Sequence, residues 1–133
     1  MNRLAELLSL RGALLLDAVA SGATALLMLI GGSLLAGLLG LPVDLLRGAG
    51  LVLVPYVATV ILIGTRQDIS SSAVRLVIAA NAIWAVASFA LMFSGWIAPT
   101  ALGYAFIAAQ AIVVALFGEL QYVGLRRQGV AAA

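Results

Sequence analysis

The sequence predicts an all-α, polytopic membrane protein, built as an antiparallel bundle of four transmembrane helices with both termini on the cytoplasmic side. Three observations predict this class: the composition, four long apolar runs and the placement of the arginines. Hydrophobic residues make up 65% of the 133 positions and charged residues only 9%. A soluble domain is about half apolar and a quarter charged. A water-soluble fold could not bury this much apolar surface.

Four apolar runs are each long enough to cross a bilayer. A transmembrane helix needs about 20 mainly apolar residues to cross a hydrocarbon core of about 30 Å. Backbone polar groups in lipid must be satisfied within their own segment, and no strand-like alternation is visible, so the runs are predicted to be helices. No room remains for a soluble domain, and we expect one four-helix domain over 1–133, with spans at about 13–39, 45–64, 72–93 and 100–125.

The arginines indicate the orientation. Six of the seven flank the same side of the predicted membrane, namely Arg3, Arg11, Arg66, Arg75, Arg126 and Arg127, and only Arg47 lies on the other side. The positive-inside rule therefore predicts a multi-pass protein of the bacterial inner (plasma) membrane with both termini cytoplasmic. The first apolar run continues to Leu41, well past a possible cleavage site at Ala18-Val19-Ala20, so we expect an uncleaved signal-anchor helix.

The residue inventory limits the chemistry. The chain has no Cys, no His and no Lys, which excludes thiolate and imidazole metal sites, disulfides and Schiff-base catalysis. We expect no metal, no cofactor and no catalytic residue. The net charge of +2 is too small to indicate a nucleic-acid partner. A lipid-modifying enzyme is the least favoured function, because its carboxylates would have to be paired and nothing in their spacing requires that.

Glu119 is an acid near the end of the fourth apolar run, and it needs an explanation. If the last two spans form a hairpin whose turn is centred near Ile97, Arg75 lies opposite Glu119 and could form an ion pair with it. The alternative is a proton- or substrate-binding acid. Asp17 lies where the positive end of the first helix favours an anion without any partner. It also heads a polar stripe with Ser21, so a shared Asp17, Arg75 and Glu119 cluster is a further hypothesis.

A second polar group is predicted nearer the centre of the bilayer. The same hairpin places Trp84 opposite Gln110, with Asn81 one turn away from Trp84. Polar side chains in hydrocarbon need partners, so we expect Asn81, Trp84 and Gln110 to form hydrogen bonds between helices, each contributing roughly 0.6–2 kcal/mol. The alternative is the lining of a small polar or ligand cavity.

Three segments of the chain carry a resemblance: "LLGLP…LRGAGLVLVPY", "NAIWAVAS" and "SGWIAPTALGYAFIAAQAIVVALFGELQYVGLRR". In these segments the chain resembles a group of short, uncharacterised four-span inner-membrane proteins of proteobacteria. The resemblance covers most of the chain from Asp17 onward. It implies a membrane location and no particular activity, and no catalytic or binding residue is carried over from it.

Small residues are dense in the first apolar run, where glycines and alanines would let another helix approach closely. They include Ala18, Gly22, Ala25, Gly31, Gly32, Ala36 and Gly37. We therefore expect a non-enzymatic interaction or accessory subunit in the lipid bilayer, forming a homo-oligomer or binding a membrane-protein partner through this face. The alternative is a small ion- or proton-coupled transporter or channel that uses Glu119, Asp17 and Arg75.

Overall fold

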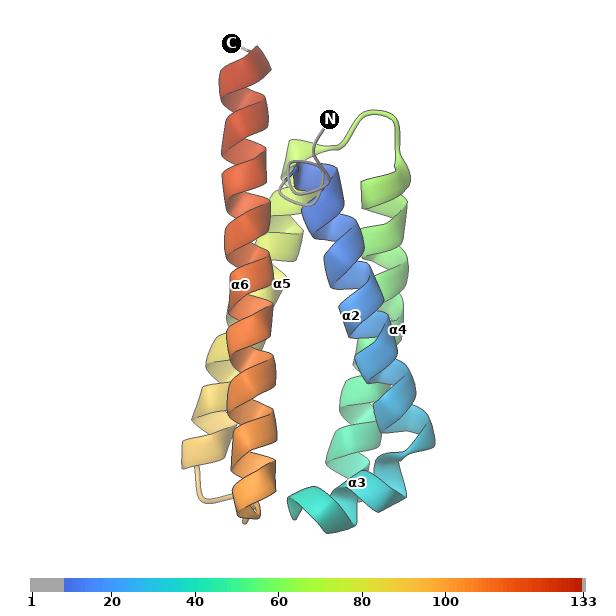
Figure 1. Cartoon of the computed structure of the whole chain (residues 1–133), viewed down its shortest axis with the longest axis vertical. Coiled ribbons are helices and arrows are strands. Elements are labelled where there is room, and N and C mark those ends of the chain that lie inside the picture. The colour runs from blue at the N-terminus through green and yellow to red at the C-terminus, as the bar shows by residue number, and fades with distance from the viewer. Residues whose placement is uncertain (1–8, 133) are drawn as a thin grey trace.

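The computed structural model describes residues 9–132, and this part of the chain is all-helical. Four long helices run antiparallel to their neighbours in sequence, and a short helix, α3, lies across one end (Figure 1). The long helices pack as two pairs, α2 with α4 and α5 with α6, whereas α4 and α5 hardly touch. The helices are α2 (Leu10–Ile30), α3 (Gly32–Leu39), α4 (Val43–Thr65), α5 (Ser71–Phe93) and α6 (Ala101–Ala132).

Four of these helices, α2, α4, α5 and α6, are long and apolar enough to cross a membrane. Large apolar side chains cover their outer faces: Val19 is 71% exposed, Ile30 82% and Leu76 73%. Such a surface is compatible with lipid and unfavourable in water, because exposed apolar area in water is unfavourable by about 25 cal/mol per Å². The chain therefore has the architecture of a multi-pass membrane protein.

The first apolar run is divided at Gly31, whereas the sequence predicts one continuous span to Leu39. Helix α2 ends at Ile30, and the Gly31 N–H donates to the Leu27 carbonyl. A Cβ at Gly31 would lie 2.9 Å from that carbonyl oxygen, so this backbone bend is open to glycine and unfavourable for larger residues. The break is not visible in a hydropathy pattern because α3 is as apolar as the span before it.

Helix α3 is joined to the start of α6 by hydrogen bonds from the backbone and side chain of Thr100. The Thr100 N–H donates to the Leu39 carbonyl at 2.9 Å, and the Thr100 hydroxyl donates to the Leu38 carbonyl, also at 2.9 Å. The same hydroxyl accepts from the Gly103 N–H and caps α6. Thr100 thus satisfies the end of one helix and the start of another.

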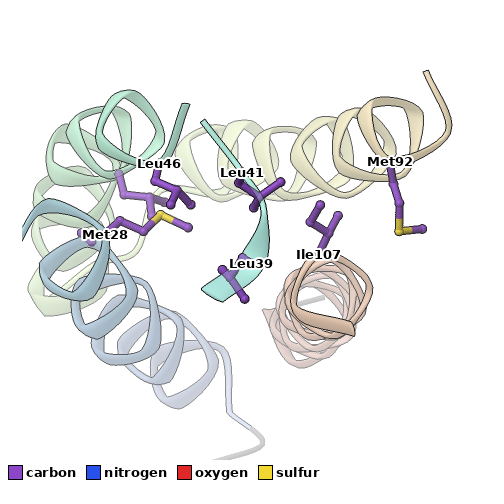
Figure 2. Packing of buried hydrophobic residues seen from close by; sticks show 8 residues of the cluster. Met28, Leu39, Leu41, Leu46, Met92 and Ile107 are labelled. Atoms are coloured by element: carbon purple, nitrogen blue, oxygen red, sulfur yellow. The ribbon is translucent and has the colours of Figure 1, made fainter. Parts of the chain in front are cut away.

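Two apolar clusters fill the interior. One lies toward α3 and contains Met28, Leu39, Leu41, Leu46, Met92 and Ile107 among its buried residues (Figure 2). The other lies toward the chain termini and contains Leu10, Leu14, Val60, Val74 and Val77 among its members. Tyr56 packs against both clusters. The candidate site described below lies at this boundary.

Arginines gather at the end of the bundle that holds both termini. Arg11 donates to three carbonyls at the end of α4, including those of Gly64 and, at 2.8 Å, Arg66. Arg75 and Arg126 line one hollow at the same end. Arg47 lies at the opposite end, where it donates to the Ser33 hydroxyl at 3.0 Å. Arg3, which the orientation prediction also uses, falls outside the described residues.

Candidate functional site

The side chain of Asp17 is fully buried in the bundle, with 0% of its surface exposed. Its Oδ1 lies 2.8 Å from the Ser21 hydroxyl. Its Oδ2 lies 2.6 Å from the Tyr56 hydroxyl, 2.7 Å from Nε2 of Gln121 and 3.2 Å from Nδ2 of Asn81. We call these five residues the Asp17 cluster, and it draws on all four long helices.

Further hydrogen bonds join the partners to one another. The Tyr56 hydroxyl lies 2.9 Å from Oδ1 of Asn81, and Nδ2 of Asn81 donates to Oε1 of Gln121 at 2.8 Å. Within the described residues, every buried side-chain nitrogen and oxygen has a hydrogen-bond partner. A polar group left unsatisfied in an apolar interior is unfavourable by several kcal/mol, so the cluster fixes the four helices relative to one another.

Local features bring the cluster together. Asp17 and Ser21 are one turn apart on α2, so both side chains lie on the same face. Gly118 lets α6 approach α5 closely, because a Cβ there would lie 3.3 Å from Cβ of Asn81. Gly50 and Gly64 do the same for α4 against α2, where added Cβ atoms would lie about 3 Å from leucine side chains. Helix-helix contacts in membranes commonly use such small residues.

A cavity of about 400 Å³ lies next to the cluster, between the two helix pairs. Its wall is mostly apolar and has no charged side chain, but Ser21, Tyr56 and Asn81 contribute polar atoms from the cluster side. Trp84 and Gln110 contribute polar atoms further along. Ligand sites typically have this combination of a mostly apolar wall and a few polar groups in a volume of roughly 300–1,000 Å³.

Two further hollows flank this cavity where α4 and α5 are apart. One, of about 600 Å³, extends from Arg66 and Ser70 at the arginine-rich end to Tyr56, which also lines the central cavity. The other, of about 370 Å³, reaches Asp44 at the α3 end and shares Trp84 and Gln110 with the central cavity. The three hollows therefore follow one another along the bundle, with Tyr56 at one boundary and Trp84 at the other.

The structure brings Trp84 and Gln110 together. Trp84 Nε1 donates to Oε1 of Gln110 at 2.8 Å, and Nε2 of Gln110 donates to the Ile107 carbonyl. Asn81 does not join this pair, because its side chain bonds to Asp17, Tyr56 and Gln121. All three residues line the central cavity, so hydrogen bonding between helices and the lining of a cavity coexist here.

Arg75 and Glu119 are both exposed, and within residues 9–132 neither forms an ion pair with the other or with Asp17. The register of α5 and α6 is the physical reason. Asn81 lies beside Gly118, about one turn further along α6 than a turn centred near Ile97 implies. In this register Arg75 lies beside residues that follow Glu119, and it lines a hollow with Tyr122 and Arg126.

Two residues of the cluster, Tyr56 and Gln121, are not among the site residues predicted from the sequence. Gln121 lies two residues after Glu119 and close to the arginines, so the sequence suggests a polar residue at the membrane edge. In the structure it is fully buried, with 0% of its surface exposed. For Asp17 the sequence leaves two interpretations open, stabilisation by the helix end alone or a cluster with Arg75 and Glu119, whereas its four side-chain partners are other residues. Gln121 lies eleven residues, or about three helical turns, after Gln110, so this spacing could have added it to the candidates without showing that it bonds to Asp17.

The described residues contain no group of three or more His, Cys, Asp or Glu side chains that could hold a metal ion. Fold and site together define a class: a multi-pass helical membrane protein in which, among residues 9–132, one buried carboxyl group is shared among four apolar helices and has a cavity beside it. The chain matches no protein-family model, no curated protein and no solved structure.

Proposed function

We propose that this protein is a small, non-enzymatic, ion- or proton-coupled membrane transporter that binds an uncharged, largely apolar molecule with one or two hydrogen-bonding groups. The observation that carries the proposal is the cavity of about 400 Å³ that Ser21, Tyr56 and Asn81 of the Asp17 cluster line on one side. An ionisable residue inside a membrane bundle is a functional-site candidate by default, because placing it there is energetically unfavourable.

The lining of the cavity defines the class of ligand. No charged side chain reaches the wall, so an ionic ligand would lose its hydration without compensation. Apolar side chains such as Phe106 and Phe117 favour an aromatic or aliphatic body, while Trp84, Asn81 and Gln110 offer hydrogen bonds. In this proposal Asp17 is the ionisable residue of the transporter. Its partner is Tyr56, in place of Arg75 and Glu119, which the sequence suggested.

The series of hollows supports a route along the α4 and α5 side. A ligand leaving the central cavity toward the arginine-rich end would pass Tyr56, and toward the α3 end it would pass Trp84. We further propose that the arginine-rich end, with both termini, faces the cytoplasm and that the membrane is the bacterial inner membrane, following the positive-inside rule.

Fluorescence tests ligand binding directly. Trp84 is one of two tryptophans, so the Trp96→Phe variant leaves it as the reporter of the cavity. In lipid nanodiscs we expect energy transfer from Trp84 to phenylnaphthylamine, an uncharged aromatic amine. Ala109→Leu should reduce that transfer at least several-fold by filling the cavity, whereas Ala115→Leu, on the same helix and not on the wall, should leave it unchanged.

Transport is tested with the same probe in proteoliposomes. Phenylnaphthylamine fluoresces in lipid and dims when it is extruded, so an imposed pH difference should lower its signal only when the protein is present. Equal extrusion by the wild type and by Ala109→Leu would contradict a route through the cavity. Energy transfer from Trp84 no greater than that from Trp96 in a Trp84→Phe variant would contradict binding there.

A second candidate function, an interaction subunit, is supported by the open side of the bundle. Helices α4 and α5 hardly touch, and Ala80 on α5 is exposed where the hollows lie. A transmembrane helix of a second copy would fit against such small residues. By contrast, Ala18 and Ala25 of the first apolar run are buried within the chain itself, so that part of the expected partner face is already occupied.

The absence of cysteine from the sequence makes this candidate easy to test. Under mild oxidation in native membranes, Ala80→Cys should form a disulfide-linked dimer if two copies meet along α4 and α5. Leu26→Cys, which places a thiol on the exposed outer face of α2, is the matched control. Equal cross-linking at both positions, or none at Ala80→Cys, would count against assembly along the open side.

A further inference from the structure

The Tyr56 hydroxyl lies between two oxygen atoms that both normally accept hydrogen bonds. It is 2.6 Å from Oδ2 of Asp17 and 2.9 Å from Oδ1 of Asn81. Both distances are typical of O–H···O hydrogen bonds. A phenol has a single proton to donate, so Tyr56 alone can supply only one of the two contacts.

A count over the whole cluster gives the same deficit. Six close contacts join its side chains, and each needs one proton. If Asp17 is ionised, Ser21 and Tyr56 supply one each, Asn81 supplies two and Gln121 supplies one, because its second N–H points at no member of the cluster. Five protons then serve six contacts.

Turning the amides over does not remove the deficit. If the Asn81 amide is reversed, its oxygen faces Oδ2 of Asp17 at 3.2 Å and Oε1 of Gln121 at 2.8 Å. Reversing Gln121 as well repairs the second contact, but it then sets the Gln121 oxygen against Oδ2 of Asp17 at 2.7 Å. Each reversal leaves at least one oxygen facing another without a proton between them.

We propose that Asp17 carries a proton on Oδ2 and donates it to the Tyr56 oxygen, so that Asp17, Tyr56 and Asn81 form a proton-binding site inside the membrane. With this proton, Asp17 donates to Tyr56, Tyr56 donates to Asn81, and Oδ2 still accepts from Asn81 and Gln121. All six contacts are then satisfied in the arrangement that the structure has.

No opposite charge compensates an ionised Asp17. The groups that face it are Tyr56 from α4, Asn81 from α5, Gln121 from α6 and Ser21 from its own helix. Of these only Tyr56 can titrate, and in the described residues no arginine bonds to the carboxyl group. A buried carboxylate with neutral partners alone is less favourable than the neutral acid.

Release of the proton changes the contacts of Tyr56. The O–H bond of Asp17 breaks, the proton passes to water in the hollow that extends from Arg66, and the Tyr56 proton turns from Asn81 to the new carboxylate. Because Tyr56 separates that hollow from the central cavity, proton release loosens this boundary. The presence of the proton is inferred from the hydrogen bonds alone. Its coupling to ligand movement depends also on the proposed function.

Infrared spectroscopy of the protein in lipid tests the proton directly. With isotopically labelled aspartate, we expect the carbonyl band of a protonated carboxylic acid at neutral pH. Asp17→Asn should abolish the band, and Asp68→Asn, in the exposed loop before α5, should leave it unchanged. Only carboxylate bands at neutral pH, or a protonated band that survives in Asp17→Asn, would overturn the proposal.

A second variant covers the case in which Asp17→Asn does not fold. Tyr56→Phe removes the acceptor of the Asp17 proton, so the protonated band should remain and move to the frequency of a weaker hydrogen bond. Tyr104→Phe, an exposed tyrosine on α6, should not move it. An unshifted band in Tyr56→Phe would overturn the assignment. Neither spectrum depends on ligand binding, so a failed transport assay leaves this result interpretable.

Discussion

Tyr56 is the side chain that links the Asp17 cluster to the hollows, because its hydroxyl belongs to the cluster and the residue lines two hollows. Its position explains why the interior holds an acid at this depth, roughly 10 Å along α2 from the first residue of that helix. The aromatic ring packs with both apolar clusters. The hydroxyl provides the polar end that the carboxyl group needs.

Tyr56→Phe should destabilise the protein by roughly 1–3 kcal/mol, because two hydrogen bonds of a membrane interior are lost, at roughly 0.6–2 kcal/mol each. Unfolding in detergent, followed by circular dichroism during a titration with sodium dodecyl sulfate, measures the change. Tyr104→Phe is the matched control and should shift the midpoint little. Equal stability of both variants would show that the Tyr56 hydroxyl contributes nothing to the fold.

The two predicted polar groups differ in how far the sequence could define them. Trp84 and Gln110 lie in the middle of apolar helices where each needs a partner, and a hairpin turn near Ile97 places them at one depth. The bond between them is therefore expected from the sequence, and it forms although the register differs by about one turn, because both side chains are long. The partners of Asp17 depend on the rotation of four helices about their axes, which hydropathy does not determine, so Tyr56 and Gln121 could not be assigned.

At the scale of elements, the existence of four spans follows from four apolar runs that are each long enough to cross a bilayer, in a chain too small to bury them all from water. The ends are less predictable. Gly31 breaks the first apolar run without a charge or a proline beside it, and α6 continues to Ala132, beyond the expected end near residue 125. The bend at Gly31 depends on backbone geometry and α6 continues through exposed polar residues at 126–128, so hydropathy defines neither boundary.

The junction of α3 and α6 requires glycine at position 103. A Cβ there would overlap the carbonyl oxygen of Leu39 and lie 2.9 Å from Cβ of Pro99. Gly103→Ala should therefore force the two helices apart and destabilise the protein by roughly 1–3 kcal/mol. Gly48→Ala, inside α4 with no atom within 4 Å of the added Cβ, should be neutral or stabilising by up to about 1 kcal/mol.

Thermal unfolding in detergent compares these two glycine variants with the wild type. Contact through the Leu39 carbonyl predicts that only Gly103→Ala unfolds at a lower temperature. A Gly103→Ala variant as stable as Gly48→Ala would mean that α3 does not pack against α6 in the folded protein.

Arg11 closes the end of α4 by donating to carbonyls that have no partner within the helix. A cation at a helix C-terminus also interacts favourably with the helix dipole. Arg11→Ala should therefore destabilise the protein by roughly 1–3 kcal/mol. The same substitution at Arg75, which is exposed, should change stability by less than about 1 kcal/mol.

Detergent unfolding of the two arginine variants also addresses the ion pair expected between Arg75 and Glu119. If Arg75→Ala were as destabilising as Arg11→Ala, an interaction of Arg75 such as that pair would have to exist in the folded protein.

At the scale of the whole molecule, the bundle consists of two tight helix pairs joined mainly by α2 and α6, with the α4 and α5 side open. The Asp17 cluster crosses the gap between the pairs at one level, since Tyr56 belongs to α4 and Asn81 to α5. Because α4 and α5 otherwise hardly touch, a change in the contact between Tyr56 and Asn81 acts where little else joins these two helices. Under the proposed function, this arrangement would link the Asp17 proton to movement between the pairs.

The distribution of arginines over the molecule predicts how it lies in the membrane. Four spans return the chain to its starting side, and Arg11, Arg66, Arg75 and Arg126 all belong to that side, against Arg47 on the other. The positive-inside rule then predicts that the loop around Asp68 is cytoplasmic and the loop around Ser94 is not.

Because the chain has no native cysteine, a single introduced thiol can report the location of each loop. In intact cells, a membrane-impermeant maleimide should label Ser94→Cys and should label Asp68→Cys only after the membrane is opened. Labelling of both thiols in intact cells would mean that the chain inserts in two orientations, and the reverse pattern would place both termini outside.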